Sequence, residues 1–252
     1  LLILLEQLEE AGIEEICLVI GEDEREEYDN FFAKLPVEHM EKLSKERRAY
    51  EKKIVDLGNK ITFVYQRKRL GFGHAVYQCR DFTQNEPVLL LLGDMLYESY
   101  EDKNCIRQVI EAFEKHGRSL VSIQAVAPEE VVHCGILYGQ WEDTEQTVLQ
   151  VERMYEKPTQ DYAVECLGVY NARNEKEYYA VFGQYVLTPD VFEELENNIR
   201  EDRRSQGEYQ LTDALDTVRE KHGLYGFKPN GKSYDIGLPE TYRKTMYEFG
   251  QH

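Results

Sequence analysis

The sequence predicts an α/β protein in which a mixed, mainly parallel central sheet carries helices on both of its faces. Two observations lead to this class. Short, continuous apolar segments recur along the first half of the chain, as expected of strands that are covered on both faces. Between them lie segments with an apolar residue at every third or fourth position, which is the period of an amphipathic helix. This alternation is typical of βαβ units, whose right-handed crossovers place helices on both sides of a sheet.

Each element of the first half follows from one of these two patterns. The continuous apolar segments are residues 16–20, 61–65, 88–92 and, less purely, 120–126. The helical spacing is present in Ile106, Val109, Ile110 and Phe113, and again in Met40, Leu43, Tyr50, Ile54 and Leu57. The second of these sets predicts one long, highly charged helix, whose charges form an ordinary solvated face.

The pattern changes after about residue 128. Residues 135–138, 147–155 and 179–187 have the longer, more alternating character of strands with one exposed face. Thr188, Pro189 and Asp190 form a strong helix start, and further helices are predicted over 210–220 and after Pro239. We therefore expect one domain over residues 1–252, parallel in its first half and mixed in its second.

The charge of the chain excludes several classes of partner. Lys and Arg number 30 and Asp and Glu 48, so the net charge is −18. Such an acidic protein repels nucleic acid polymers and anionic membranes. Its longest apolar run, 88–92, is far shorter than the roughly 20 residues that span a bilayer.

The five cysteines are irregularly spaced and predict neither a disulfide framework nor a zinc ribbon. With no export signal at the start of the printed sequence, we expect the protein in the reducing cytoplasm. Cys17 lies inside an apolar strand and is expected to be a small buried hydrophobic residue.

Two aspartates stand where open α/β sheets bind ligands, beyond the carboxyl ends of strands. Asp94 follows the apolar strand 88–92, and Asp235 precedes a glycine and the final helix. From the residues alone, Asp94 fits a turn or helix cap as well as a metal ligand, and Asp235 fits a cap of the final helix.

Two other motifs carry groups that suit a phosphorylated ligand. Gly71 and Gly73 stand between a strand and a helix, where glycines allow close approach of a backbone and a helix N-terminus favours acceptor groups. The alternative is a tight turn before the helix. Glu156 and Lys157 end an extended segment and could take a sugar hydroxyl and a phosphate, or form an ordinary charged strand end before Pro158.

Taken together and in this order, the motifs resemble those of the sugar-1-phosphate nucleotidyltransferase family, and within it the bacterial branch that uses UTP and glucose 1-phosphate. The segments that carry the resemblance span nearly the whole chain: LGFGHAVYQCRDF, EPVLLLLGDM, CGILYG, VERMYEKP, YAVFGQYVLTPDVFEEL, GEYQLTDAL and KSYDIGLPETY. The resemblance implies a Rossmann-like nucleotidyltransferase fold with a nucleotide-binding half over 1–127 and a sugar-binding half over 128–252.

The resemblance also implies roles for residues of the nucleotide-binding half. Gly71 and Gly73 would lie against the nucleobase and ribose, and Gln66 would read the pyrimidine edge. Asp94 and Asp235 resemble the pair that holds Mg²⁺, with Asp94 also at the nucleotide. Two carboxylates are hard oxygen ligands, which suits this cation.

On the sugar side, the resemblance implies that the backbone of Gly135 faces the sugar. Glu156 would bind the sugar hydroxyls and Lys157 the sugar phosphate. Lys157 and Asp94 would be the catalytic pair, through charge rather than acid–base chemistry. The family further implies a homo-oligomer.

The expected reaction forms UDP-glucose and pyrophosphate from UTP and glucose 1-phosphate. Alternatives are a relative that uses dTTP or another hexose 1-phosphate, and a non-catalytic protein that binds nucleotide sugars. The non-catalytic alternative is considered because family members begin with a strand and a glycine-rich loop that carries a basic residue. Neither feature occurs in the 252 residues. We therefore expect an N-terminally incomplete nucleotide half, a gap beside the strand 16–20, and a chain that folds but is catalytically weak or inactive as printed.

Overall fold

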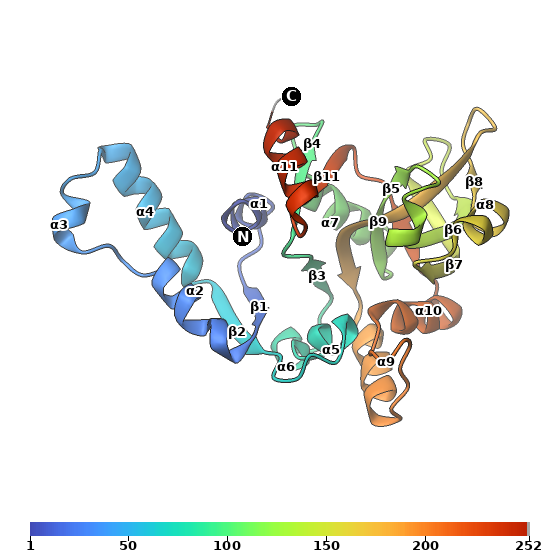
Figure 1. Cartoon of the computed structure of the whole chain (residues 1–252), viewed down its shortest axis with the longest axis horizontal. Helices are drawn as coiled ribbons and strands as arrows, with labels where there is room; N and C mark the ends of the chain where they lie inside the picture. The colour runs from blue at the N-terminus through green and yellow to red at the C-terminus, as the bar shows by residue number, and fades with distance from the viewer. Residues whose placement is uncertain (251–252) are drawn as a thin grey trace.

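The computed structural model describes residues 1–250, arranged around a central seven-stranded sheet and two smaller sheets (Figure 1). In the central sheet the order is β3-β9-β5-β10-β7-β6, with β8 beside β9. Its strands are β3 (Val88–Leu91), β5 (Leu120–Val126), β6 (Gly135–Trp141), β7 (Val148–Glu156), β8 (Val169–Tyr170), β9 (Lys176–Leu187) and β10 (Tyr225–Phe227). The smaller sheets pair β1 (Ile16–Ile20) with β2 (Ile61–Tyr65) and β4 (Met95–Ser99) with β11 (Gly231–Asp235).

The central sheet is mixed, as predicted, but the expectation that it is mainly parallel is wrong. Within it β5 and β10 form a parallel ladder, whereas the ladders of β9 with β3, β5, β6 and β8 are antiparallel. The reason is β9, a strand of 12 residues that runs between β3 and β5 in the opposite direction. The strands β3, β5 and β10 do share one direction, but β9 separates the first two.

Helices cover both faces of this sheet, in agreement with the prediction. On one face, α5 (Phe72–Tyr77), α9 (Pro189–Arg200) and α10 (Leu211–His222) contribute to the largest apolar core together with inward residues of β5, β7 and β9. On the other face, α7 (Cys105–His116) packs Val109 and Ala112 against Leu120 and Val186. The alternation of β9 divides its side chains between these two cores.

The remaining helices lie around the two smaller sheets and the loops. They are α1 (Leu2–Glu10), α2 (Arg25–Phe31), α3 (Val37–Met40), α4 (Lys45–Gly58), α6 (Arg80–Thr83), α8 (Gln160–Cys166) and α11 (Pro239–Glu248). The single helix expected from Met40 to Leu57 is wrong, because the segment forms α3 and α4 with a break between them. Ser44 causes the break: its hydroxyl accepts from the Arg47 N–H at 3.3 Å and caps α4. No helix among residues 1–250 is both long and apolar enough to cross a membrane.

The strands β1 and β2 form a sheet of their own. Figure 1 shows this pair beside the helices α2 to α4, apart from β3. Within residues 1–250, β1 has a ladder only to β2, and β3 has one only to β9. All four residues of β3 remain half-buried although each is Val or Leu, which is unusual for so apolar a strand. Within residues 1–250, no β-ladder connects the β1–β2 pair to the central sheet, and the expected absence of a strand beside 16–20 stays a prediction.

Candidate functional site

Asp94 and Asp235 are brought together by the ladder between β4 and β11. Asp94 directly precedes β4, Asp235 is the last residue of β11, and the antiparallel register pairs Met95 with Asp235. The ladder is extended past its end by the Ile236 N–H, which donates to the Asp94 carbonyl at 2.8 Å. Both acids therefore stand at the same end of this two-stranded sheet.

The two carboxylates converge on Gly237. A Cβ atom at this glycine would lie 2.8 Å from Oδ2 of Asp94 and 3.2 Å from Oδ1 of Asp235. The Gly237 N–H donates to Oδ1 of Asp235 at 2.7 Å and fixes that carboxylate. Neither acid forms an ion pair with a Lys, Arg or His of the described range. The geometry thus leaves two carboxylates facing one point without a cation of the protein between them.

The structure removes the helix-cap alternative for both acids, whereas the turn expected at Asp94 is present, since the Met95 N–H donates to the Leu92 carbonyl at 3.3 Å. Asp94 is followed by a strand, so it does not cap a helix. The N-cap of α11 is Leu238, which makes no side-chain capping bond, so Asp235 does not cap that helix either. Instead, Thr245 of α11 donates to the Asp235 carbonyl at 3.1 Å and anchors the end of β11.

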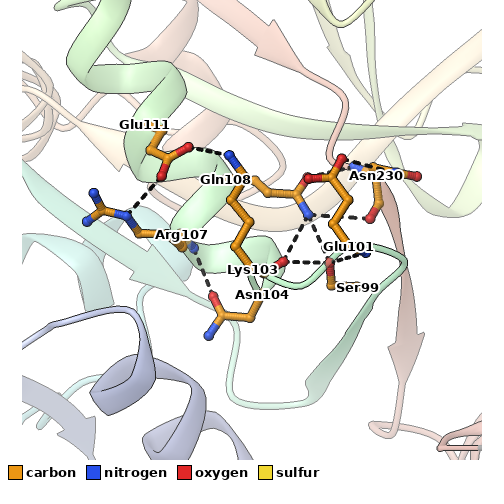
Figure 2. Close-up of polar contacts among 8 residues, drawn as sticks. All are labelled: Ser99, Glu101, Lys103, Asn104, Arg107, Gln108, Glu111 and Asn230. Atoms are coloured by element: carbon orange, nitrogen blue, oxygen red, sulfur yellow. Dashed lines mark hydrogen bonds and ion pairs between the residues drawn. The ribbon is translucent and has the colours of Figure 1, made fainter.

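A buried amide in α7 holds the opposite end of the same ladder. Figure 2 shows Gln108 between Ser99 and Asn230: its Nε2 donates to the Ser99 hydroxyl at 3.0 Å, and its Oε1 accepts from the Asn230 N–H at 2.8 Å. Asn230 in turn donates to Glu101 at 3.0 Å. Gln108 is only 6% exposed, so these bonds also satisfy a costly buried group. The network fixes the register of β4 and β11 and, with it, the meeting of the two acids.

The residues predicted for the sugar lie together at the end of β6 and β7. Gly135 pairs with Glu156 in the ladder, and a Cβ on Gly135 would stand 3.1 Å from Oε2 of Glu156. The same oxygen accepts a hydrogen bond from the hydroxyl of Thr212, in the first turn of α10, at 3.1 Å. The absence of a side chain at Gly135 therefore leaves room for the Glu156 carboxylate, and the contact of Gly135 with a sugar stays a prediction.

Lys157 is held in an unusual backbone conformation next to this carboxylate. Its φ of +47° is in the left-handed region, which a residue with a Cβ rarely adopts. Its N–H donates to the Cys134 carbonyl at 3.1 Å, and its ammonium lies 4.0 Å from Oε1 of Glu156 with 58% of the side chain exposed. Strained backbone conformations of this kind are frequent at functional sites.

The Cys134 thiol is affected by charges from both the acid pair and the sugar side. Burial raises the pKa of the Cys134 thiol, and the carboxylates of Glu130, Glu156 and Asp235 raise it further. The ammonium of Lys157 acts in the opposite direction. Asp235 and the Glu156–Lys157 pair thus lie within electrostatic range of the same thiol.

The nucleotide-side residues form a second group, beyond the end of β2. The Gln66 amide donates from Nε2 to the Gly71 carbonyl at 3.0 Å and lies 3.2 Å from Nδ1 of His74. A pocket of about 340 Å³ opens here, lined by Tyr65, Arg67, Lys68, His74 and Gln78. The pKa of His74 is lowered by burial and by the charge of Lys68, which favours the neutral imidazole.

Gly71 and Gly73 face another segment of the chain. Gly71 has a φ of +114°, and a Cβ on either glycine would stand 2.8 Å from the Tyr209 carbonyl oxygen. The Gly73 N–H donates to this oxygen at 2.9 Å, and the Tyr209 N–H donates to the Leu70 carbonyl at 2.9 Å. This close backbone packing accounts for both glycines by itself, so their contact with nucleobase and ribose stays a prediction.

Residues 208–212 therefore connect the two groups, and the sequence analysis assigned them no role. Tyr209 packs on the glycines of the nucleotide side, and Thr212 binds the Glu156 carboxylate of the sugar side. From the sequence, the segment GEYQLTDAL contributes only to the family resemblance. A threonine at the start of a helix is too common to indicate a site, because its usual role is local capping.

The donor atoms of the acid pair suit Mg²⁺. Within residues 1–250 no group of three or more His, Cys, Asp or Glu residues could enclose a metal ion. Mg²⁺ is commonly held by one or two carboxylates, with substrate phosphates and water as its other ligands. An ion between Asp94 and Asp235 would also relieve the repulsion of two carboxylates that converge on one glycine.

The chain is similar to known proteins of one family. The model of the nucleotidyl transferase family matches residues 1–251. UTP–glucose-1-phosphate uridylyltransferase 2 of Staphylococcus saprophyticus is 33% identical over 251 residues, which are 98% of this chain and 79% of that protein. UTP–glucose-1-phosphate uridylyltransferase of Staphylococcus haemolyticus is 32% identical over 250 residues, which are 98% of this chain and 79% of that protein.

Two solved structures of UDP-glucose pyrophosphorylase have the same fold. The apo form superimposes with a TM-score of 0.82 at 29% identity, over 97% of this chain and 84% of that one. The form complexed with UDP-glucose has a TM-score of 0.77 at 28% identity and the same coverage. The family match and these relatives lead to one conclusion: the chain belongs to the nucleotidyl transferase family.

Proposed function

We propose that this protein transfers the uridylyl group of UTP to glucose 1-phosphate, forming UDP-glucose and releasing pyrophosphate. The observation that carries the proposal is the convergence of Asp94 and Asp235 on Gly237, close to the Glu156–Lys157 pair. This arrangement offers a cation site next to a carboxylate and an ammonium. The names of the relatives in Staphylococcus and the complex of a related structure with UDP-glucose support the choice of substrates.

The reaction needs positioning and charge neutralisation more than proton transfer. A phosphate oxygen of glucose 1-phosphate forms a bond to the α-phosphorus of UTP, and the bond from that phosphorus to the β-phosphate oxygen breaks. The attacking oxygen is already ionised at neutral pH, so no strong base is required. Mg²⁺ bound by Asp94 and Asp235 would supply positive charge at the crowded phosphates.

The sugar-side residues would hold the acceptor. Lys157 would bind the phosphate of glucose 1-phosphate through a charge-assisted hydrogen bond. Glu156 would accept from the sugar hydroxyls with Oε1, since its Oε2 already accepts from Thr212. Holding the attacking oxygen in line with the leaving group is the largest contribution that such a site makes.

On the nucleotide side, Gln66 would recognise the pyrimidine. Its Nε2 is engaged with Gly71 and His74, which orients the side chain. The amide oxygen takes no part in these contacts, so it can accept a hydrogen bond from the N3–H of uracil. The pocket of about 340 Å³ beside it, lined by Tyr65, His74 and Gln78 among others, has room for the base.

We also propose a cytoplasmic location, because the substrates are multiply charged phosphates that do not cross membranes unaided. The homo-oligomer implied by the family resemblance stays a prediction.

Pyrophosphate release from UTP and glucose 1-phosphate tests the proposal, measured on the full natural chain with and without Mg²⁺. We expect turnover that depends on both substrates and on Mg²⁺. Replacing UTP by dTTP measures the nucleotide preference, and replacing glucose 1-phosphate by galactose 1-phosphate measures the sugar preference. Absence of turnover together with absence of UDP-glucose binding would contradict the proposal, and binding without turnover would favour the non-catalytic alternative.

A further inference from the structure

Two cysteines that are far apart in the sequence meet beside the nucleotide-side residues. Cys17 lies in β1, and Cys79 lies in the turn that joins α5 to α6. Their Sγ atoms are 3.4 Å apart and part-buried. Cys17 is thus half-buried and in contact with a second thiol, which corrects the expectation of a simple buried hydrophobic residue.

The other three cysteines have different surroundings. Cys105 is 1% exposed in the core, and its thiol faces the Glu98 carbonyl. Cys134 and Cys166 belong to the apolar cluster around α8, in the other part of the sheet. Among the described residues, no other pair of Sγ atoms lies within hydrogen-bond distance. The Cys17–Cys79 pair therefore stands alone as two thiols in contact that remain partly open to solvent.

We propose that Cys17 and Cys79 form a site of thiol–disulfide exchange, which low-molecular-weight disulfides such as oxidised glutathione convert to an intramolecular disulfide. The Cys17 thiolate attacks one sulfur of the oxidant, forms a mixed disulfide and releases one thiol. Cys79 then attacks the sulfur of Cys17, forms the Cys17–Cys79 bond and releases the second thiol. Two cysteine thiols are oxidised, one disulfide is reduced, and the two protons end on the released thiols.

The surroundings support this order of events. The hydrogen-bonded contact with Cys79 lowers the pKa of Cys17, so Cys17 ionises first. The same bond, with burial, raises the pKa of Cys79. Bond formation requires the sulfurs to approach from 3.4 Å to the S–S length of about 2 Å, a movement of about 1.4 Å.

The disulfide would join two parts of the molecule that share no β-ladder. Cys17 belongs to the two-stranded sheet of β1 and β2, whereas Cys79 follows α5, which packs on the central sheet. The bond closes a loop of chain that contains β2, α4 and the glycine turn. Oxidation would therefore tie the two-stranded sheet to the end of α5, the helix whose N-cap is Gly71.

Peptide mapping tests the proposal on the native protein. The protein is treated with oxidised glutathione, free thiols are blocked with iodoacetamide, and the trypsin digest is analysed by mass spectrometry without reduction. The tryptic peptide that ends at Arg25 contains Cys17, and the peptide 70–80 contains Cys79. We expect these two peptides to be joined in the oxidised protein and separate after reduction.

Three variants sharpen the result. Cys17→Ser and Cys79→Ser should each abolish the joined peptides and leave a mixed disulfide with glutathione on the remaining cysteine. Cys134→Ser is the matched control and should leave the joined peptides at the wild-type level. The proposal is overturned if both cysteines are recovered blocked by iodoacetamide, if both carry glutathione, or if the joined peptides appear only after oxidation in denaturant.

Discussion

The hydroxyl of Thr212 donates a hydrogen bond to Oε2 of Glu156 across 3.1 Å. The two residues are 56 positions apart and belong to α10 and β7. The bond occupies one carboxylate oxygen and leaves the other, Oε1, facing the Lys157 ammonium at 4.0 Å. In the proposed reaction Thr212 would be a positioning residue, because it orients the Glu156 carboxylate that would bind the sugar.

Replacement of Thr212 tests this relationship. Thr212→Val removes the donor but keeps the shape, so we expect a KM for glucose 1-phosphate that is raised roughly 10-fold, as is typical for loss of a hydrogen bond to a charged group. The KM for UTP should change little. Thr217→Val in the same helix is the matched control, because its hydroxyl bonds only the Asp213 carbonyl. Equal changes in both KM values would show that Thr212 is merely structural.

Gly237 should be required for the acid pair. In Gly237→Ala the new Cβ would stand 2.8 Å from Asp94 Oδ2, so the carboxylates must separate. We expect the Mg²⁺ concentration for half-maximal activity to rise, with melting temperature little changed. Gly93→Ala is the control, because a Cβ there meets nothing within 4 Å although it adjoins Asp94. A Mg²⁺ requirement that is raised equally in both variants would contradict the predicted geometry.

Loss of the Lys157 charge should separate sugar-phosphate binding from nucleotide binding. Lys157→Ala removes a charge-assisted contact worth about 1.5–3 kcal/mol, so UDP-glucose should bind roughly 10-fold to 150-fold more weakly and UMP nearly as before. Calorimetry with both ligands measures this. Lys157→Gly removes the same charge, and glycine adopts the φ of +47° without strain. If both variants weaken UDP-glucose binding equally, the effect is due to the lost charge. Equal weakening of UMP and UDP-glucose would contradict the assigned role.

The reactivity of Cys134 reports the charges around the site. The pKa of this thiol is raised, so at a given pH above neutrality it carries less thiolate than an exposed cysteine and reacts more slowly with iodoacetamide. Asp235→Asn removes one of the charges that raise the pKa, so the pH profile of alkylation should move to lower pH. Lys157→Ala removes the opposing charge and should move it to higher pH.

Asp23→Asn, in the exposed turn at 22–24, is the control for this measurement and should leave the profile unchanged. A profile that is insensitive to Asp235→Asn would mean that the acid pair and the sugar-side residues do not share one site.

The elements that the sequence predicts well are those whose signal is local. The strands β1, β2 and β3 are continuous apolar runs, and α9 begins at the predicted Thr188-Pro189-Asp190 start. The meeting of Asp94 and Asp235 at one end of the β4–β11 ladder agrees with the expectation that the two carboxylates lie close together, and their role at a metal stays a prediction.

What the sequence could not show depends on contacts between distant segments. The insertion of β9 between β3 and β5 reverses most ladders, and no local pattern states which strand lies next to which. Strands β4 and β11 are short and contain charged residues, so their alternation is too weak to identify them. The role of Thr212 likewise exists only once α10 lies against β7.

The central claim is that Asp94 and Asp235 act as one cation-binding unit in uridylyl transfer. A double-mutant cycle of Asp94→Asn and Asp235→Asn, read as kcat for pyrophosphate release at saturating Mg²⁺, tests it most directly. We predict that each single variant loses activity on the order of 100-fold, as when one preorganised group is removed from a charged site. The double variant should lose little more than either single one, because the first change already disables the unit. Losses that multiply in the double variant, or a single variant with wild-type activity, would contradict the account.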